Sequence, residues 1–356
     1  MLRPRAPGRL LLTVFLSVVV ADGSFPDPCR GQSVAPPAVQ YLRPPPWASQ
    51  IFGIDSRSHV SNTTVFPWSA VGQVQAFFGN VILEGTGAMI GNKTVLTAAH
   101  VVYDPSLGGW PDFIIFIAGR NGNAKPFGEA TVVEHAAPWA WIDREDEASD
   151  IAVLVLDQSV GEQTGFFKIA EPDPSFFEGL SLMSSGYPAD LNNNFQYSAP
   201  GPGLGADGNF LLEKIDTESG QSGSPIWYDD TASGEPRLVA VLKGTRTITD
   251  NFGRVTVQGI GVLISPQMAT LINQTLTANG DVAQDIPTAP IEPPPTPTVE
   301  VACGNCGAGT GQALLASTLG WGACLVSRRH YAAAPRRNHR RDHAHVLKAS
   351  NRHPGA

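Results

Sequence analysis

The sequence predicts an all-β domain, a sandwich or barrel of short antiparallel strands, in the middle of the chain. Short segments rich in β-branched residues recur there, Gly, Asn, Asp and Pro interrupt them, and only one segment has a clear helical pattern. Regularly spaced short strands are typical of sandwiches and barrels. The predicted strands are residues 73–79, 80–91, 94–102, 113–119, 130–137, 150–156, 180–186, 209–216, 237–244 and 254–264.

The one predicted helix comes after all the strands, over residues 265–276. Ser265 is a good N-cap residue, and Pro266 suits the first helical position, where its missing N–H would be unpaired in any case. We therefore expect a carboxy-terminal helix that closes the folded domain.

The ends of the chain differ from this domain in composition. Residues 1–21 combine three arginines with the short apolar run Leu10–Val20 and a small residue, Ala21, which is the pattern of a secretory signal peptide. Residues 22–50 are rich in proline and are interpreted as a pro-segment or extended arm, and 281–300 as a proline-rich linker. The folded domain is therefore expected over residues 51–280.

The tail at residues 301–356 has two interpretations. Residues 301–327 carry no charged side chain, Ala313–Val326 is apolar, and arginines follow at once, a pattern found at single-span membrane anchors. Fourteen apolar residues fall short of the 20 or so that a span needs, which favours a flexible secreted tail. Secretion is the prediction, and anchoring at the cell surface through 307–327 is its alternative.

The net charge argues against a nucleic-acid-binding protein, and the number of cysteines argues against a structural zinc site. The chain has a net charge of −8, and residues 1–327 alone carry −15, so no basic face for nucleic acid is expected. The domain has no cysteine between positions 30 and 302, and the pairing of the four cysteines stays open, with a local disulfide or a bond to Cys29 as the alternatives. One C-x-x-C pair is too few ligands for structural zinc, and no metal or organic cofactor is predicted. These cysteines are Cys29, Cys303, Cys306 and Cys324.

Three N-x-S/T sequons occur in the predicted domain, at Asn62, Asn92 and Asn273. In a secreted protein they are candidate glycosylation sites on surface loops.

A serine in a Gly-rich turn is the candidate nucleophile. Residues 220–225 read G-Q-S-G-S-P, with Ser222 two positions after Gly220. A serine hydroxyl needs a base to become nucleophilic, and the resulting oxyanion needs donors. We expect the backbone amides of Gly220 and Ser222 to form that oxyanion hole. The alternative interpretation is a simple Gly/Ser hairpin loop.

A histidine and an aspartate complete the candidate constellation. His100 follows the apolar segment T-V-L-T-A-A and is expected to project from a strand end as general base. Asp150 directly precedes the apolar run I-A-V-L-V-L, where it could orient the imidazole and stabilise its charged form. The acidic residues at 143, 145, 146 and 147 are interpreted as a solvated loop or a weak cation site.

These motifs resemble the chymotrypsin-like serine peptidases, in particular the bacterial glutamyl-endopeptidase-like branch. The resemblance covers residues 51–275 and is carried by 53–68, T-A-A-H at 97–100, 118–128, D-I-A-V-L at 150–154, D-T-E-S-G-Q-S-G-S-P at 216–225 and G-V-L-I at 261–264. The order His, Asp, Ser is that of the chymotrypsin type. The resemblance implies two antiparallel β-barrels with His100 and Asp150 on the first and Ser222 on the second.

The residues expected at the substrate pocket depart in part from that branch. Thr217 fits the glutamyl pattern, but Leu242 stands where the resemblance implies a histidine. Asp216 occupies the position at which trypsin-like enzymes read arginine, with another role in this branch. Lys243 could offer positive charge to an acidic substrate, although a solvated lysine at a strand end is the preferred interpretation. Gln221 replaces the aspartate that pairs with a new N-terminus in animal enzymes.

The sequence therefore predicts a monomeric, secreted serine endopeptidase acting on proteins or peptides, with an open preference for the residue before the scissile bond. Removal of the proline-rich segment is expected to leave a mature start near residues 51–53. The alternative from another class is a non-catalytic binding or adhesion protein on the same fold. An esterase is disfavoured because the motif is not G-x-S-x-G.

Overall fold

The computed structural model describes residues 40–42, 50–170, 173–249 and 252–289. The predicted signal peptide, most of the proline-rich segment, the linker beyond residue 289, the tail and all four cysteines lie outside these described residues. No helix among them is long and apolar enough to cross a membrane.

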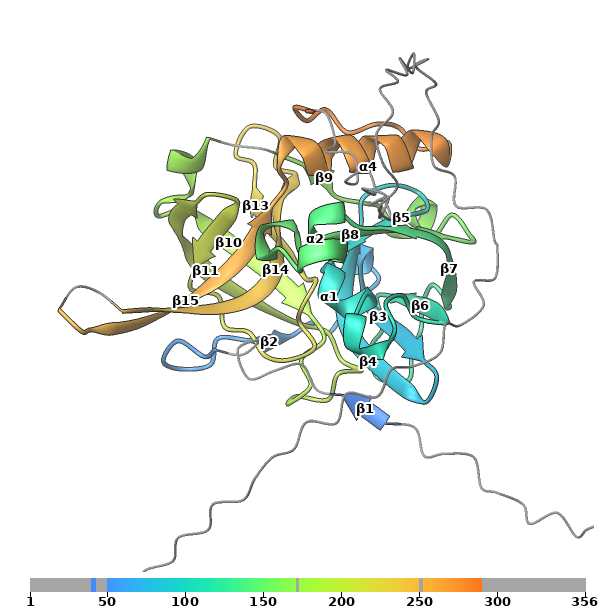
Figure 1. Cartoon of the computed structure of the whole chain (residues 1–356), viewed down its shortest axis with the longest axis horizontal. Coiled ribbons are helices and arrows are strands. Elements are labelled where there is room, and N and C mark those ends of the chain that lie inside the picture. Colours follow the sequence, from blue (N-terminus) through green and yellow to red (C-terminus); the bar gives the residue numbers. More distant parts are fainter. Residues whose placement is uncertain (1–39, 43–49, 171–172, 250–251, 290–356) are drawn as a thin grey trace, which may run out of the picture. The chain divides into compact units, whose positions relative to one another are not determined.

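The first half of the domain is a closed antiparallel barrel of six strands (Figure 1). Around the ring the order is β4–β3–β6–β7–β8–β5, and β5 pairs back onto β4. A three-residue strand from the proline-rich segment, β1 (Gln40–Leu42), adds in parallel to β4 outside the ring. The six strands are β3 (Val71–Phe78), β4 (Val81–Met89), β5 (Thr94–Thr97), β6 (Phe113–Ala118), β7 (Ala130–Ala136) and β8 (Ala152–Leu156).

The second half repeats this architecture with six further strands, in the order β10–β13–β14–β15–β12–β11, and β11 closes the ring onto β10. The strands are β10 (Ser181–Gly186), β11 (Tyr197–Asp207), β12 (Phe210–Glu213), β13 (Pro225–Asp229), β14 (Pro236–Thr249) and β15 (Val255–Leu263). Two short strands join it, β2 (Ser58–His59) beside β11 and β9 (Lys168–Ile169) in parallel with β14. The predicted two-barrel fold is confirmed.

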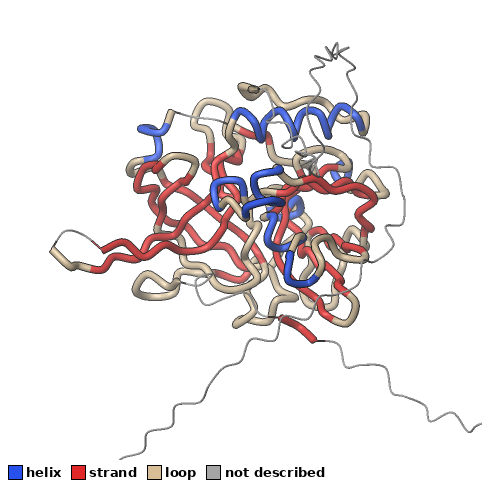
Figure 2. The backbone as a smooth tube through the Cα atoms, in the orientation of Figure 1, coloured by secondary structure: helices blue, strands red, loops and turns tan. Residues whose placement is uncertain are grey.

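Helices are short except for the last, as Figure 2 shows. They are α1 (Ala99–Val102), α2 (Trp139–Arg144), α3 (Gly161–Thr164) and α4 (Pro266–Ala278). The Ser265 hydroxyl caps α4 by accepting from the Met268 N–H at 3.3 Å, as predicted. Ile272 and Leu276 are fully buried on the core-facing side of α4.

Five strands escaped prediction, β1, β2, β9, β11 and β13, and the sequence of β11 looks like a turn. It contains the segment G-P-G-L-G at 201–205, whose glycines and proline read as breakers. In the barrel these glycines permit close approach: a Cβ at Gly201 would lie 2.4 Å from the Lys214 carbonyl oxygen, and one at Gly203 2.3 Å from that of Phe177. Backbone from other parts of the chain passes close to these two positions, and they therefore require glycine. No local sequence pattern reveals this contact.

The packed domain extends past the predicted boundary at residue 280. The Asp281 carboxylate accepts hydrogen bonds from the Asn92 and Lys93 backbone amides at 2.9 and 3.2 Å. The Gln284 amide donates to the carbonyl oxygens of Ile90 and Phe167. The first nine residues of the predicted linker, 281–289, therefore pack against the first barrel and α4.

Candidate active site

His100 and Asp150 are brought together by the first barrel. His100 lies in the single turn of α1, not at a strand end as predicted, and Asp150 precedes β8. The imidazole Nδ1 is 2.7 Å from the Asp150 Oδ2, and the His100 backbone N–H donates to Oδ1 at 2.9 Å. Both carboxylate oxygens thus hold His100, one through its ring and one through its backbone.

Asp150 is fully buried. Burial alone would raise the pKa of its carboxyl group, but the charge and hydrogen bonds of His100, together with the Lys243 ammonium, hold that pKa below its usual value. Trp141 from α2 covers the site, with its ring centroid 6.5 Å from that of His100. The carboxylate is therefore ionised and screened from water, as an orienting group requires.

Ser222 lies on a tight turn of the second barrel that reaches across to the first. The Ser222 carbonyl oxygen accepts from the Thr86 N–H of β4 at 2.8 Å. A Cβ at Gly223, where φ is +87°, would lie 2.1 Å from the Thr86 carbonyl oxygen and 3.0 Å from the Ala98 amide nitrogen. The turn is therefore packed against the residues that lead into α1 and His100. Within the described chain, the buried Ser222 hydroxyl has no hydrogen-bond partner.

At the turn that carries Ser222, two backbone N–H groups donate to no backbone carbonyl of the described residues. The N–H groups of Gln221, Gly223 and Ser224 donate to the carbonyl oxygens of Glu218, Leu242 and Gln221, respectively. The N–H groups of Gly220 and Ser222, the predicted oxyanion donors, make no such bond to any described residue. Position 220 requires glycine for two reasons: its φ is +92°, and a Cβ there would lie 2.4 Å from the Tyr187 carbonyl oxygen. The loop geometry thus keeps two donors available beside the candidate nucleophile, Ser222.

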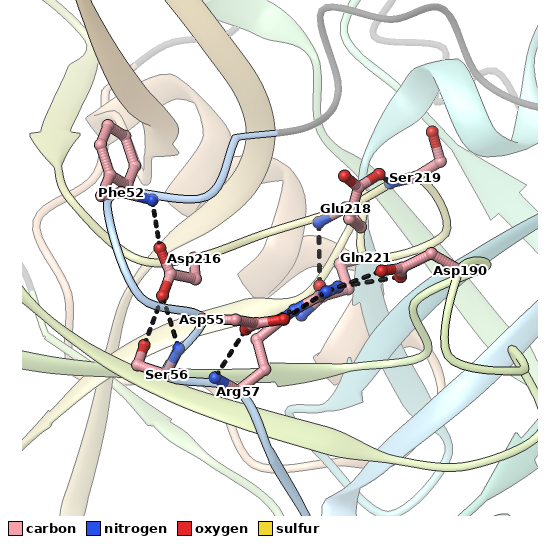
Figure 3. A network of polar contacts seen from close by, with 9 residues as sticks. All are labelled: Phe52, Asp55, Ser56, Arg57, Asp190, Asp216, Glu218, Ser219 and Gln221. Carbon is pink, nitrogen blue, oxygen red and sulfur yellow. Dashed lines mark hydrogen bonds and ion pairs between the residues drawn. The ribbon is translucent and has the colours of Figure 1, made fainter.

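The Asp216 carboxylate is occupied by the amino-terminal segment, as Figure 3 shows. It accepts from the Phe52 N–H at 2.6 Å, the Ser56 N–H at 2.8 Å and the Ser56 hydroxyl at 2.7 Å. The charge of Asp216 is therefore satisfied by the protein's own chain, 160 or more residues away in sequence.

Arg57 ties the same segment to a loop beside the oxyanion donors. Its side chain is only 2% exposed, and its guanidinium forms ion pairs with Asp55 at 2.8 Å and Asp190 at 2.7 Å. Burial opposes the charge, but these carboxylates outweigh it and raise the pKa of Arg57. One residue from Asp190, the Ala189 N–H donates to the Ser219 carbonyl oxygen at 2.7 Å. Sequence reasoning missed Arg57 because the fold, and not the local sequence, brings Asp190 to it.

Lys243 is buried, so the preferred interpretation of a solvated lysine at a strand end is wrong. Its side chain is 5% exposed, with Nζ 3.9 Å from Asp150 Oδ2 and 3.6 Å from Glu147 Oε1. Glu147, expected to be a solvated loop residue, is thus its partner. Leu242 is 1% exposed in the core, and Thr217 is fully buried with a hydroxyl that has no partner in the described part of the chain.

The three sequons differ in accessibility. Asn62 is exposed, and its side chain only accepts from Thr64. Asn92 is half-buried, and the Thr94 hydroxyl of its sequon is buried against Asp281 at 3.1 Å. The Asn273 amide donates to the Gln284 carbonyl oxygen at 3.0 Å and accepts from the Gln284 N–H at 2.7 Å. Of the three, Asn62 therefore offers the exposed amide nitrogen.

Comparison with known proteins agrees with this geometry. A family model described as Trypsin matches residues 56–201, a range that includes His100 and Asp150 and ends before Ser222. The chain is 31% identical over 182 residues to a glutamyl endopeptidase of Bacillus licheniformis, a match that covers 51% of this chain and 56% of the relative. This chain therefore spans only a little over half the length of that relative.

Two further relatives extend the similarity. A protein of Bacillus subtilis named extracellular metalloprotease is 29% identical over 234 residues, 63% of this chain and 73% of its own. A solved Glu endopeptidase in complex with MPD matches with a TM-score of 0.53 and 25% identity, covering 64% of this chain and 99% of its own. Among the described residues, no group of three or more His, Cys, Asp or Glu could hold a metal ion.

Proposed function

We propose that this chain, which carries a trypsin-family domain on the chymotrypsin-like fold near the glutamyl endopeptidases, is a serine endopeptidase with His100, Asp150 and Ser222 as its triad. The observation that carries the proposal is the pair of bonds from His100 to the buried Asp150, at 2.7 and 2.9 Å, beside the cross-barrel turn of Ser222. This is the arrangement that activates a serine hydroxyl.

The mechanism follows from these positions. His100 takes the proton of the Ser222 hydroxyl as its oxygen attacks a peptide carbonyl, and Asp150 stabilises the imidazolium that forms. The amides of Gly220 and Ser222 bind the oxyanion, each such donor being worth about 10²–10³ in rate. His100 then protonates the leaving amine, and water, activated by the same imidazole, releases the acyl group from Ser222.

Substrate preference is proposed from the pocket residues. Asp216 is engaged with Phe52 and Ser56, which argues against a role in binding a basic side chain. The Thr217 hydroxyl, buried five residues before Ser222, is the group we propose to face the substrate. Two of the relatives are named as glutamyl endopeptidases, so an acidic residue before the scissile bond is the first preference to test.

The domain organisation is proposed around this catalytic unit. Residues 1–21 direct secretion, the segment to residue 50 is removed on maturation, and the monomeric protease domain, which includes 281–289, is followed by a linker and tail. Amino-terminal sequencing of the secreted product checks the first two boundaries, and fractionation without detergent distinguishes a secreted protein from one anchored through 307–327.

The decisive experiment is cleavage of a peptide library, varied at the residue before the scissile bond, by the secreted protein and its Ser222→Ala variant. Cleavage that disappears in the variant supports the triad, and the preferred residue defines the pocket. If the folded, processed wild type cleaves no peptide, the non-catalytic binding protein becomes the better hypothesis.

A further inference from the structure

Lys243 is a buried cation beside the orienting aspartate. It is the extra residue of a β-bulge in β14: Leu242 pairs with Gly261 of β15, Gly244 pairs with the adjacent Ile260, and Lys243 stands between them. A bulge redirects one side chain out of the regular alternation of a strand. Here the redirected ammonium ends 3.9 Å from Asp150 Oδ2, with 5% of the side chain exposed.

Burying an ammonium is costly unless it is paired. Lys243 has two carboxylates within reach, the buried Asp150 and Glu147, whose side chain is 63% exposed. Its interaction with Asp150, the carboxylate that holds His100, is therefore the one that solvent screens least. A lysine directed inward at this point indicates a role in the charge balance of the site.

Three charged groups of α2 and of the neighbouring 3₁₀ helix have partners of their own: Asp143, Arg144 and Asp146. Asp146 caps the 3₁₀ helix Glu147–Ser149 and accepts from the Ala148 N–H and the Ser149 hydroxyl. On α2, Arg144 lies 3.9 Å from Asp143. Lys243 thus acts on the His100–Asp150 pair at short range, and Glu147 acts more weakly because of solvent screening.

We propose that Lys243 is a positioning residue of the triad, whose ammonium holds Asp150 ionised and in place and offsets part of the pull of that carboxylate on the His100 proton. This inference rests on the proposed function of the triad. An unopposed buried carboxylate favours a charged imidazolium beside it. The Lys243 ammonium, 3.9 Å from Asp150 Oδ2, opposes that effect.

The test is the pH dependence of kcat/KM, whose acid limb reports the protonation of the essential base in the free enzyme. Lys243→Met and Lys243→Gln, which remove the charge, should move the acid limb to higher pH by on the order of one unit. Lys243→Arg keeps the charge and should leave the limb near its wild-type position. A matched control is Lys168→Met, which removes an exposed lysine paired with Glu235 at 2.9 Å and should not move it.

A second readout does not need catalysis. In the Ser222→Ala background, NMR titration of the His100 ring should show the same upward displacement on Lys243→Met. This separates the inference from the proposed function: a wild type without peptidase activity refutes the function, while the titration still tests Lys243. A folded Lys243→Met or Lys243→Gln protein whose titration and acid limb coincide with those of Lys168→Met would overturn the proposal.

Discussion

Thr86 of the first barrel donates its backbone N–H to the carbonyl oxygen of Ser222 in the second, at 2.8 Å. The Thr86 hydroxyl also donates to the Gly220 carbonyl oxygen at 2.9 Å and accepts from the Tyr187 N–H at 3.1 Å. One buried residue of β4 therefore holds both the proposed nucleophile and the loop of the proposed oxyanion donors. The candidate site depends on this contact between barrels as much as on its reactive groups.

Replacing Thr86 by valine tests that dependence. The change keeps the shape but leaves the Tyr187 amide and Gly220 carbonyl without their partner, at a cost of about 1–3 kcal/mol each when such groups stay buried. We expect a lower midpoint of urea unfolding and a larger loss in kcat than in substrate binding. Thr131→Val, at an exposed position of β7, is the control and should change neither. Unchanged kcat in Thr86→Val would contradict the assigned role.

Gly223→Ala should abolish activity. Its Cβ would lie 2.1 Å from the Thr86 carbonyl oxygen and 2.4 Å from the Thr97 hydroxyl, so the turn must move away from the first barrel. Gly234 has a similar positive φ of +69°, and a Cβ added there would have no atom within 4 Å, so Gly234→Ala carries only the backbone strain of about 1–2 kcal/mol. Peptidase assays and thermal melts of both variants test this difference. Gly223→Ala should lose activity through displacement of the turn, whereas Gly234→Ala should show only the effect of backbone strain.

Asp150→Asn should lower kcat by about 10⁴, the loss measured for such a change in another serine protease, because asparagine favours the wrong imidazole tautomer. The matched control is Asp157→Asn, which follows the opposite end of β8 and whose carboxylate accepts only an exposed bond from the Thr131 N–H at 3.1 Å. Steady-state kinetics on a peptide cleaved by the wild type provide the measurement. Equal activity of the two variants would argue against Asp150 as the orienting group.

Arg57→Met should loosen the loop that supports the proposed oxyanion donors. The variant leaves Asp55 and Asp190 without their shared cation, and because these carboxylates are about 41% exposed the expected loss of stability is about 1–3 kcal/mol, below that of a fully buried pair. We also expect a fall in kcat. Arg246→Met removes an arginine that pairs with Asp207 at 2.9 Å at a more exposed position, and serves as control.

Glu213 should make the folded domain less stable as the pH rises from about 4.5 to about 8. Burial raises the pKa of its carboxyl from 4.5 to about 8, the Ile215 N–H lowers it in part, and Asp216 raises it further. Across this range the folded protein keeps a proton that the unfolded chain releases, so the free energy of unfolding falls by at most about 1.4 kcal/mol per pH unit. Urea unfolding of wild type and Glu213→Gln between pH 5 and pH 8 checks this, since the variant should lose that component of the slope. Parallel curves for the two proteins would refute it.

Much of the fold could be predicted from local pattern. Continuous apolar runs such as the one after Asp150 become central strands because every side chain in them is buried, and Ser265 caps its helix through a bond to the N–H three residues on. The strand β11 could not be predicted, since its glycines Gly201 and Gly203 are required by backbone that crosses from other parts of the chain.

For the site, the sequence by itself determined the three reactive residue types, their order and the Gly-rich turn, because the chemistry requires those groups and the motifs are local. Only the tertiary structure decided the surroundings of that chemistry. It engages Asp216 with Phe52 and directs Lys243 at Asp150 through a bulge. Charge pairing acts through space, so the partner of a buried ionised group depends on which distant strands and loops the fold brings within a few ångströms.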